Sequence, residues 1–291
     1  SPYAAFESRE FRLFQSARFL TTVGTQMQSV AIGWQVYAIR HDPMDLGLVG
    51  LAQFVPMMVL SLLTGHVADR FDRRKVVVVC QFALAIASLC LMALSWTGVR
   101  HPWLIFLVLI LLGGARAFIG PVNQALLPHV VPQVHFANAV SWASSIWQVA
   151  TILGPAAGGM LYGAAGPQLV NGLSASFILL SLILVALMRV TSIGQSGKAT
   201  SLADVFAGVR YVWKAKVIFG AISLDLFAVL FGGAVALLPV FAKDILHAGP
   251  WALGFLRSAP SMGAVCTAVF LAYVPIRRRA GVVMLVSVAV F

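Results

Sequence analysis

The densest group of charged side chains in this sequence lies between Gly65 and Lys75. Six of the seven residues from Asp69 to Lys75 are charged, and apolar runs flank the segment on both sides. Basic residues beside an apolar span anchor a chain at a membrane surface, and we assign Lys75 and part of the role of Arg74 to such anchoring. The negative charge of Asp69 opposes anchoring by basic residues, so anchoring does not explain this residue. Its carboxylate can pair with a cation or face a helix N-terminus, so this residue indicates a moving mechanism.

Three further charged residues stand inside long apolar runs, where charges are rare. Asp225 lies within Leu-Asp-Leu-Phe-Ala-Val-Leu-Phe, and Arg257 and Arg116 lie in two other runs. A charge at the centre of a bilayer costs about 2.5–3.5 kcal/mol on insertion scales, so it needs a counter-charge, a water-filled cavity or a proton. We predict that Asp225 is either a group that takes up and releases a proton or one half of a buried ion pair with Arg257 or Arg116.

Polar side chains form stripes on two of the apolar runs. Their spacing of three, four or seven residues places each set on one face of a helix. Polar stripes on lipid-embedded helices must face protein or water. The stripes therefore predict either a neutral cavity for a bulky amphiphilic molecule or hydrogen bonds between packed helices. The stripe residues are Thr21, Thr25, Gln28, Gln35, Ser141, Ser145 and Gln148.

The elements that must position these residues are membrane-spanning helices. The chain is 60% hydrophobic and 10% charged and has a mean hydropathy of +0.93, which is more apolar surface than a soluble core could hide. A membrane helix needs about 20 mostly apolar residues. Such windows predict a ninth helix beginning near Gly281 and eight complete helices before it, at residues 15–39, 45–68, 75–97, 102–127, 136–163, 167–190, 217–242 and 250–275.

The predicted fold class is an all-α integral membrane protein. We divide the chain into a cytoplasmic N-terminal segment (1–14), a six-helix half (15–190), a cytoplasmic linker with an amphipathic helix (191–216) and an incomplete second half (217–291). Of the 20 Lys and Arg residues, only Arg40, Arg100 and Lys243 then fall in outside loops, so the positive-inside rule places the N-terminus in the cytoplasm. The net charge of +11 follows this topology and argues against nucleic-acid binding.

An internal repeat links the two halves. At an offset of 204 residues, Gly50 and Pro56 fall on Gly254 and Pro260, and the tribasic cluster 73–75 falls on the cluster 277–279. A parallel repeat of six-helix units is typical of secondary transporters, with a central site between the halves. A second half of six helices would extend beyond Phe291, so we expect the sequence to be a truncated piece of a longer protein.

On these residues, the chain resembles the major facilitator superfamily, and within it the drug and siderophore exporter branch that includes macrolide-efflux and enterobactin-exporter-like proteins. The family pattern after the second helix, G-x-x-x-D-R-x-G-R-[RK], has Asp72 here in place of its second glycine. A helix-four pattern, R-x-x-x-G, fits Arg116 and Gly120. The first pattern is matched by Gly65, Asp69, Arg70, Arg73 and Arg74, and the antiporter-type pattern G-P-x-x-G-G by Gly154, Pro155, Gly158 and Gly159.

The resemblance implies a major facilitator fold, here truncated within the second six-helix half. It implies a secondary active transporter in the cell membrane that exports amphiphilic small molecules, drug-like or siderophore-like, by proton-coupled alternating access. The residues from Gly65 to Arg74 would gate the cytoplasmic side by latching the two halves together. We expect a multi-pass monomer that contacts substrate, protons and the lipid bilayer, with no cofactor, metal or enzymatic activity.

Two other interpretations remain open at this point. A related facilitator could translocate lipids or lysophospholipids, and a truncated chain could be inactive or regulatory. A membrane-embedded enzyme would need a catalytic constellation, which we do not find in the sequence.

Overall fold

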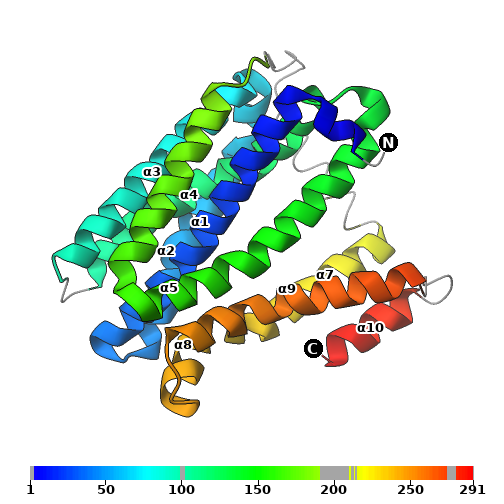
Figure 1. The fold of residues 1–291 in the computed structure, drawn as a ribbon. Helices are drawn as coiled ribbons and strands as arrows, with labels where there is room; N and C mark the ends of the chain where they lie inside the picture. Colours follow the sequence, from blue (N-terminus) through cyan, green and yellow to red (C-terminus); the bar gives the residue numbers. More distant parts are fainter. Residues whose placement is uncertain are drawn as a thin grey trace.

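The computed structural model describes residues 3–98, 102–190, 210, 213, 215–273 and 280–290, and the described part is built from helices joined by short turns. Successive helices cross the molecule in alternating directions (Figure 1). The linker helix expected within 191–216 falls almost entirely outside the described residues. The long helices are α1 (Arg9–Arg40), α2 (Pro43–Arg70), α3 (Arg73–Trp96), α4 (Trp103–Leu126), α5 (Phe136–Ala186), α7 (Lys216–Phe231), α9 (Pro250–Tyr273) and α10 (Ala280–Val290).

The helix labelled α5 consists of two arms of opposite direction. Ala165 (φ −143°) and Gly166 (φ 76°, ψ −177°) leave helical geometry between them. Glycine adopts a positive φ without steric cost, and Pro167 suits the first turn of the helix that follows. The arms 136–164 and 167–186 therefore correspond to the fifth and sixth helices predicted from the sequence.

Side-chain caps explain where several helices begin. The Ser8 side chain accepts a hydrogen bond from the Phe11 amide at the start of α1, and the Asp42 side chain accepts one from the Met44 amide at the start of α2. Asp72 caps α3 in the same way by accepting from the Arg74 amide at 3.0 Å. Asp is among the best N-cap residues, which gives a structural reason for the one departure from the family pattern.

The seventh helix differs from its prediction. We expected one helix over 217–242, but α7 ends at Phe231 and is followed by the 3₁₀ turn η4 (Gly232–Leu237), the single turn α8 (Leu238–Val240) and the π turn η5 (Phe241–Ile245). Two adjacent glycines make α-helix costly at 232–233, and Pro239 lacks the amide needed to continue the ladder. The apolar run is present, but the backbone within it is interrupted.

Five helical stretches among the described residues are long and apolar enough to cross a membrane. The stretch 133–186 contains the break at 165–166 and has length for two crossings. Neither α1 nor the 16-residue α7 is among them. The five are Pro43–Ser61, Arg73–Trp96, Trp103–His129, Gln133–Ala186 and Pro250–Leu271.

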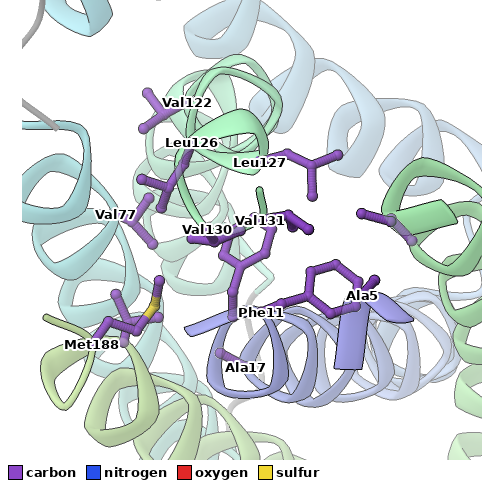
Figure 2. Packing of buried hydrophobic residues seen from close by; sticks show 14 residues of the cluster. Ala5, Phe11, Ala17, Val77, Val122, Leu126, Leu127, Val130, Val131 and Met188 are labelled. Atoms are coloured by element: carbon purple, nitrogen blue, oxygen red, sulfur yellow. The ribbon is translucent and has the colours of Figure 1, made fainter. Parts of the chain in front are cut away.

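The bundle has two ends that are treated separately below. The N-side is the end that carries η1 (Ala4–Glu7), the α2–α3 turn at 71–72 and the connection 127–135, and the far side carries the turns at 41–42, 165–166 and 246–249. A cluster of buried apolar residues fastens α1, α3, α4 and the second arm of α5 together at the N-side. Figure 2 shows its members converging, among them Phe11, Val77, Val122, Leu126 and Met188.

Candidate functional site

The far-side halves of α5 and α9 pack backbone against backbone. A Cβ added to Gly159 would lie 2.6 Å from the Pro250 carbonyl oxygen. One added to Gly254 would lie 2.5 Å from the Pro155 carbonyl oxygen. Real side chains do not approach backbone so closely, so this contact requires glycine on both helices.

Two hydrogen bonds continue this contact toward the middle of the bundle. Ser258 Oγ donates to the Ile152 carbonyl at 2.8 Å, and Gln148 Nε2 donates to the Ser261 carbonyl at 2.8 Å. Beyond these residues the two helices diverge toward the N-side (Figure 1), and residues 262–270 of α9 are all exposed. We call the contact over residues 148–159 and 250–261 the α5–α9 seam.

Polar side chains join α1 to the segment after α8 at the far side. The Tyr37 hydroxyl donates to the Asp244 carboxylate, and Lys243 Nζ lies 2.8 Å from His41 Nε2. The Lys243 ammonium also lies 6.0 Å from the centroid of the Trp34 ring, within cation–π range. These residues, together with the α5–α9 seam, connect the first half of the chain to the second at the far side.

Sequence reasoning missed this far-side cluster. From the sequence, Lys243 was assigned only to an outside loop, and 202 residues separate it from His41. A pairing over such a distance leaves no local periodicity in a single sequence. The one available signal was the presence of Asp244 next to Lys243 at the end of an apolar run.

Arg257 lies at the same interface, deeper in the bundle. Its Nη1 donates to Ser29 Oγ on α1 at 3.0 Å, and a Cβ added to Gly33 would lie 3.1 Å from its Nη2. Its Nε is buried and has no hydrogen-bond partner among the described residues. The side chain of Asp225 lies outside the part that the structure describes, so the predicted pairing of Asp225 with Arg257 stays a prediction.

Arg116 acts within the first half of the chain. Its Nη1 donates to Gln53 Oε1 at 2.7 Å and so connects α4 to α2. The two helices are close here, because a Cβ on Gly113 would lie 2.3 Å from the Gln53 carbonyl oxygen. The contact of Arg116 is therefore internal to one half, whereas that of Arg257 crosses between halves.

A cavity of about 700 Å³ lies between α1, α4 and the first arm of α5, in the N-side part of the bundle. Two of the predicted stripe residues, Thr21 and Gln148, line it. Arg18 also lines it. From the sequence we place this residue on the cytoplasmic side with most of the other Lys and Arg residues, although it lies within the first predicted span, 15–39. The remaining lining residues are Thr22, Ile119, Gly120, Asn123, Gln124, Leu127, Val140, Ala143, Ser144 and Trp147.

The other stripe residues have partners elsewhere. Thr25 Oγ1 donates to the Thr21 carbonyl at 2.8 Å on its own helix. Ser141 and Ser145 donate to carbonyls one turn back in α5 at 3.1 and 3.0 Å. Gln28 and Gln35 accept hydrogen bonds from α3, as described next.

Three polar pairs connect α1 to α3, which run in the same direction. Gln81 Nε2 donates to Thr21 Oγ1 at 2.7 Å. Ser88 Oγ donates to Gln28 Oε1 at 3.4 Å, and Ser95 Oγ donates to Gln35 Oε1 at 3.3 Å. Each pair is separated by 60 residues, so the three rungs share one register.

The basic residues of the charged segment bind helix ends of their own half. Arg73 Nη1 donates to the Ala125 carbonyl at 3.1 Å, near the end of α4. Arg74 donates to the carbonyls of Val185 (Nε, 3.2 Å) and Ala186 at the end of α5. A cation is favourable at a helix C-terminus. Gly65 and Arg70 are exposed, and the side chain of Asp69 lies outside the described part.

The glycines of the antiporter-type pattern make close backbone approaches to two different helices. A Cβ on Gly154 would lie 2.5 Å from Gln26 Cβ, and one on Gly158 would lie 2.7 Å from Met27 Cα, both on α1. Gly159 instead faces α9. Within this pattern, α5 is therefore held against α1 on one face and against the second half of the chain on another.

Comparisons with known proteins point to one group. A family model described as transmembrane secretion effector matches residues 1–291. The multidrug efflux pump Tap of Mycobacterium tuberculosis is 25% identical over 279 residues, which cover 90% of this chain and 65% of that protein. The staphyloferrin A transporter of Staphylococcus aureus is 28% identical over 152 residues, covering 52% of this chain and 38% of that protein.

Two further comparisons agree. The macrolide efflux protein A of Streptococcus pyogenes is 22% identical over 240 residues, covering 81% of this chain and 58% of that protein. The fold is similar to a crystal structure of the peptide transporter POT, with a TM-score of 0.61 at 12% identity, covering 92% of this chain and 70% of that one. The chain spans less than two thirds of the length of each of the three curated relatives.

Proposed function

The chain belongs to the transmembrane secretion effector family of major facilitator transporters, and we propose that it exports amphiphilic small molecules by proton-coupled alternating access. The observation that carries this proposal is the asymmetry of the bundle. A cavity lies in its N-side part, while the glycine contact of the α5–α9 seam closes the far side. In the proposed cycle, the N-side is cytoplasmic, and the structure corresponds to the state open to that side.

The relatives that are named as a multidrug efflux pump, a macrolide efflux protein and a staphyloferrin A transporter support the export of small molecules. The cavity supports the same conclusion, because pockets for drug-sized ligands measure about 300–1,000 Å³ and this one measures about 700 Å³. Its wall combines amide and hydroxyl groups with Trp147, Ile119 and Val140. Such a wall suits a molecule with both apolar and hydrogen-bonding parts.

The proposed cytoplasmic gate is the segment from Gly65 to Arg74. In the state closed on the N-side, Asp69 would bind a cation or helix N-terminus of the second half and latch the halves together. Arg73 and Arg74 fix the segment to the ends of α4 and α5, so the latch residue is carried by a firmly held turn. Asp225 is the proposed proton-titrating group, with a structural ion pair as its alternative.

The test is dye efflux from cells that lack their own exporters, with expression checked by detergent-solubilised gel filtration. Asp69→Asn should lower efflux at least about tenfold, the loss expected when a charged hydrogen bond is removed. Asp72→Asn is the matched control, because it removes a charge from the same turn while asparagine caps α3 as well as aspartate does. Equal loss in both variants would contradict the latch, and absence of efflux from the wild type would contradict the export function.

Proton coupling is tested separately with Asp225→Asn in everted vesicles. Uptake of the dye should become independent of an imposed pH gradient, because the amide cannot exchange a proton. Uptake that still follows the gradient would remove Asp225 from the coupling role and favour the ion pair.

A further inference from the structure

The cavity between α1, α4 and α5 carries a positive charge that the described structure does not neutralise. Arg18 lines it and is half-buried, and its guanidinium carbon lies 5.5 Å from the centroid of the Phe14 ring. Arg18 forms no ion pair with any carboxylate among the described residues; the pairs formed there include Arg9 with Glu10 and Arg40 with Asp45. A guanidinium in this position has donors available for an incoming anion.

The polar groups around Arg18 are neutral. Thr22, Gln124 and Ser144 contribute hydroxyl and amide groups to the lining, and no aspartate or glutamate is among the lining residues. Asn123 is 8% exposed, and its Oδ1 is buried without a hydrogen-bond partner in the described part of the chain. Neutral hydroxyl and amide groups and one cation therefore surround the cavity, and no described carboxylate offsets the positive charge.

The position of Arg18 separates it from the anchoring bases. It is the tenth residue of α1 and the fourth of the predicted span 15–39, and charged residues within a membrane span normally face the bundle interior or a water-filled cavity. Arg12 lies on the same helix, is exposed and does not line the cavity. Anchoring at lipid headgroups accounts for Arg12 but does not require a base inside the cavity.

The cavity also offers an apolar surface beside the charge. The Trp147 side chain is 50% exposed and lines the cavity with Val140 and Ile119. An aromatic or aliphatic body can pack there while an anionic group reaches Arg18 on the neighbouring helix. The volume of about 700 Å³ accommodates both parts of such a molecule.

We propose that Arg18 is an anion-binding residue of this cavity, and that the exported molecule carries a carboxylate or a comparable anionic group on a partly apolar body. This inference rests on the proposed export function and narrows its substrate class. From the sequence, one of the two interpretations of the polar stripes was a neutral cavity. A permanent guanidinium charge in a partly dehydrated site favours anions over neutral analogues and disfavours cations.

Binding of three fluorescent probes tests the proposal: dansylglycine, dansylglycinamide and dansylethylenediamine, which share one aromatic body and present an anion, a neutral amide and a cation. The full chain is reconstituted in phosphatidylcholine nanodiscs. The wild type should bind dansylglycine about tenfold or more tightly than the amide, as expected for a hydrogen-bonded charge. The amine should bind most weakly.

The variants are Arg18→Gln, Arg18→Lys and the control Arg12→Gln. Arg18→Gln should remove the preference for dansylglycine while leaving the amide affinity within about twofold, because only the charged contact is lost. Arg18→Lys should keep part of the preference, since the charge stays but the two-pronged donor geometry is lost. Arg12→Gln should keep all of it. A preference that survives Arg18→Gln, or is lost equally in Arg12→Gln, would overturn the proposal.

Two further arms separate the possible sources of failure. If cells with the wild type export the dye but Arg18→Gln leaves the preference for dansylglycine over dansylglycinamide unchanged, the export function stands and the anion inference fails. If no dye is exported by the wild type, the export function itself fails. If adding phosphatidylglycerol to the nanodiscs abolishes the Arg18-dependent preference, Arg18 binds lipid headgroups, and a soluble anionic substrate is excluded at this site.

Discussion

The two ends of the α5–α9 pair show how one pair of helices can be closed at one side of a bundle and open at the other. At the far side, glycines allow backbone contact, and the Tyr37–Asp244 and Lys243–His41 pairs close the neighbouring turns. Toward the N-side, α5 carries the wall of a cavity and α9 is exposed. At the closed end, glycines let two backbones meet and side-chain pairs join the turns, whereas at the open end polar side chains of α5 line a cavity.

The distance between two spin labels measures whether the N-side end of the α5–α9 pair is open or closed. Spin labels on the exposed Cys266 and on Val134→Cys, with Cys90 replaced by alanine, report the separation of α9 from the start of α5 at the N-side. A long distance corresponds to the state described here, and a short one to N-side closure. The buried Cys80 is left in place.

The largest effect is expected for Gly254→Ala. Its Cβ would lie 2.5 Å from the Pro155 carbonyl oxygen, and such overpacking costs about 1–3 kcal/mol, which shifts the equilibrium by about fivefold to 150-fold. The long-distance population and the efflux rate should both fall. Gly263→Ala is the control, because nothing lies within 4 Å of a Cβ there on the same helix. Similar losses in both variants would mean that α9 itself, rather than the seam, is damaged.

A somewhat smaller effect is expected for Arg257→Gln. The variant removes the charged donor to Ser29 across the two halves, so the long-distance population should fall about tenfold. Arg116→Gln provides the comparison, since Arg116 bonds Gln53 within one half. It should lower the thermal stability but leave the distance distribution unchanged. A shift of the distribution by Arg116→Gln would contradict this division.

Tyr37→Phe should have a modest effect. It deletes the hydrogen bond to Asp244, which is exposed and therefore well solvated, so a shift of about threefold in the same population is expected. Tyr162→Phe serves as the control, because Tyr162 packs against Trp34 and its hydroxyl forms no hydrogen bond with a described residue. An unchanged distribution in Tyr37→Phe would show that the Tyr37–Asp244 hydrogen bond does not help to close the far side.

The smallest effect concerns the open end. Ser145→Ala should leave dye binding and the distance distribution unchanged, because its hydroxyl bonds the Ser141 carbonyl on its own helix and does not line the cavity. Ser144→Ala, one residue earlier, removes a hydroxyl from the cavity wall and should weaken binding about twofold to fivefold. If Ser145→Ala weakened dye binding and Ser144→Ala did not, the ligand would lie on the other face of α5.

Apolar windows predicted most of the helices within a few residues, because lipid-embedded helices must be long and apolar. The interruption after Phe231 was not predicted, since hydropathy does not record whether a glycine pair and Pro239 unwind a helix or are tolerated in it. The polar stripe on α1 was predicted, but only the packing shows that Gln28 bonds Ser88 of α3, while Thr21 both bonds Gln81 of α3 and lines the cavity.

The far-side contacts between the halves lay beyond sequence reasoning for another reason. His41 meets Lys243 and Arg257 meets Ser29 over more than 200 residues, and such pairs depend on how the halves dock. The family pattern contains Gly159 and the internal repeat contains Gly254, the two glycines that meet in the seam, because close backbone approach restricts the residue type. A contact such as that of Lys243 with His41 imposes no such restriction, because both residue types are also common in exposed loops.

The ladder between α1 and α3 has a consequence for how force passes through the first half. Its rungs at Thr21–Gln81, Gln28–Ser88 and Gln35–Ser95 repeat every seven residues, which is close to two helical turns. Sliding one helix along the other by a single residue would break all the rungs together, so the ladder resists shear along its whole length. We therefore expect α1 and α3 to keep one register and to move together.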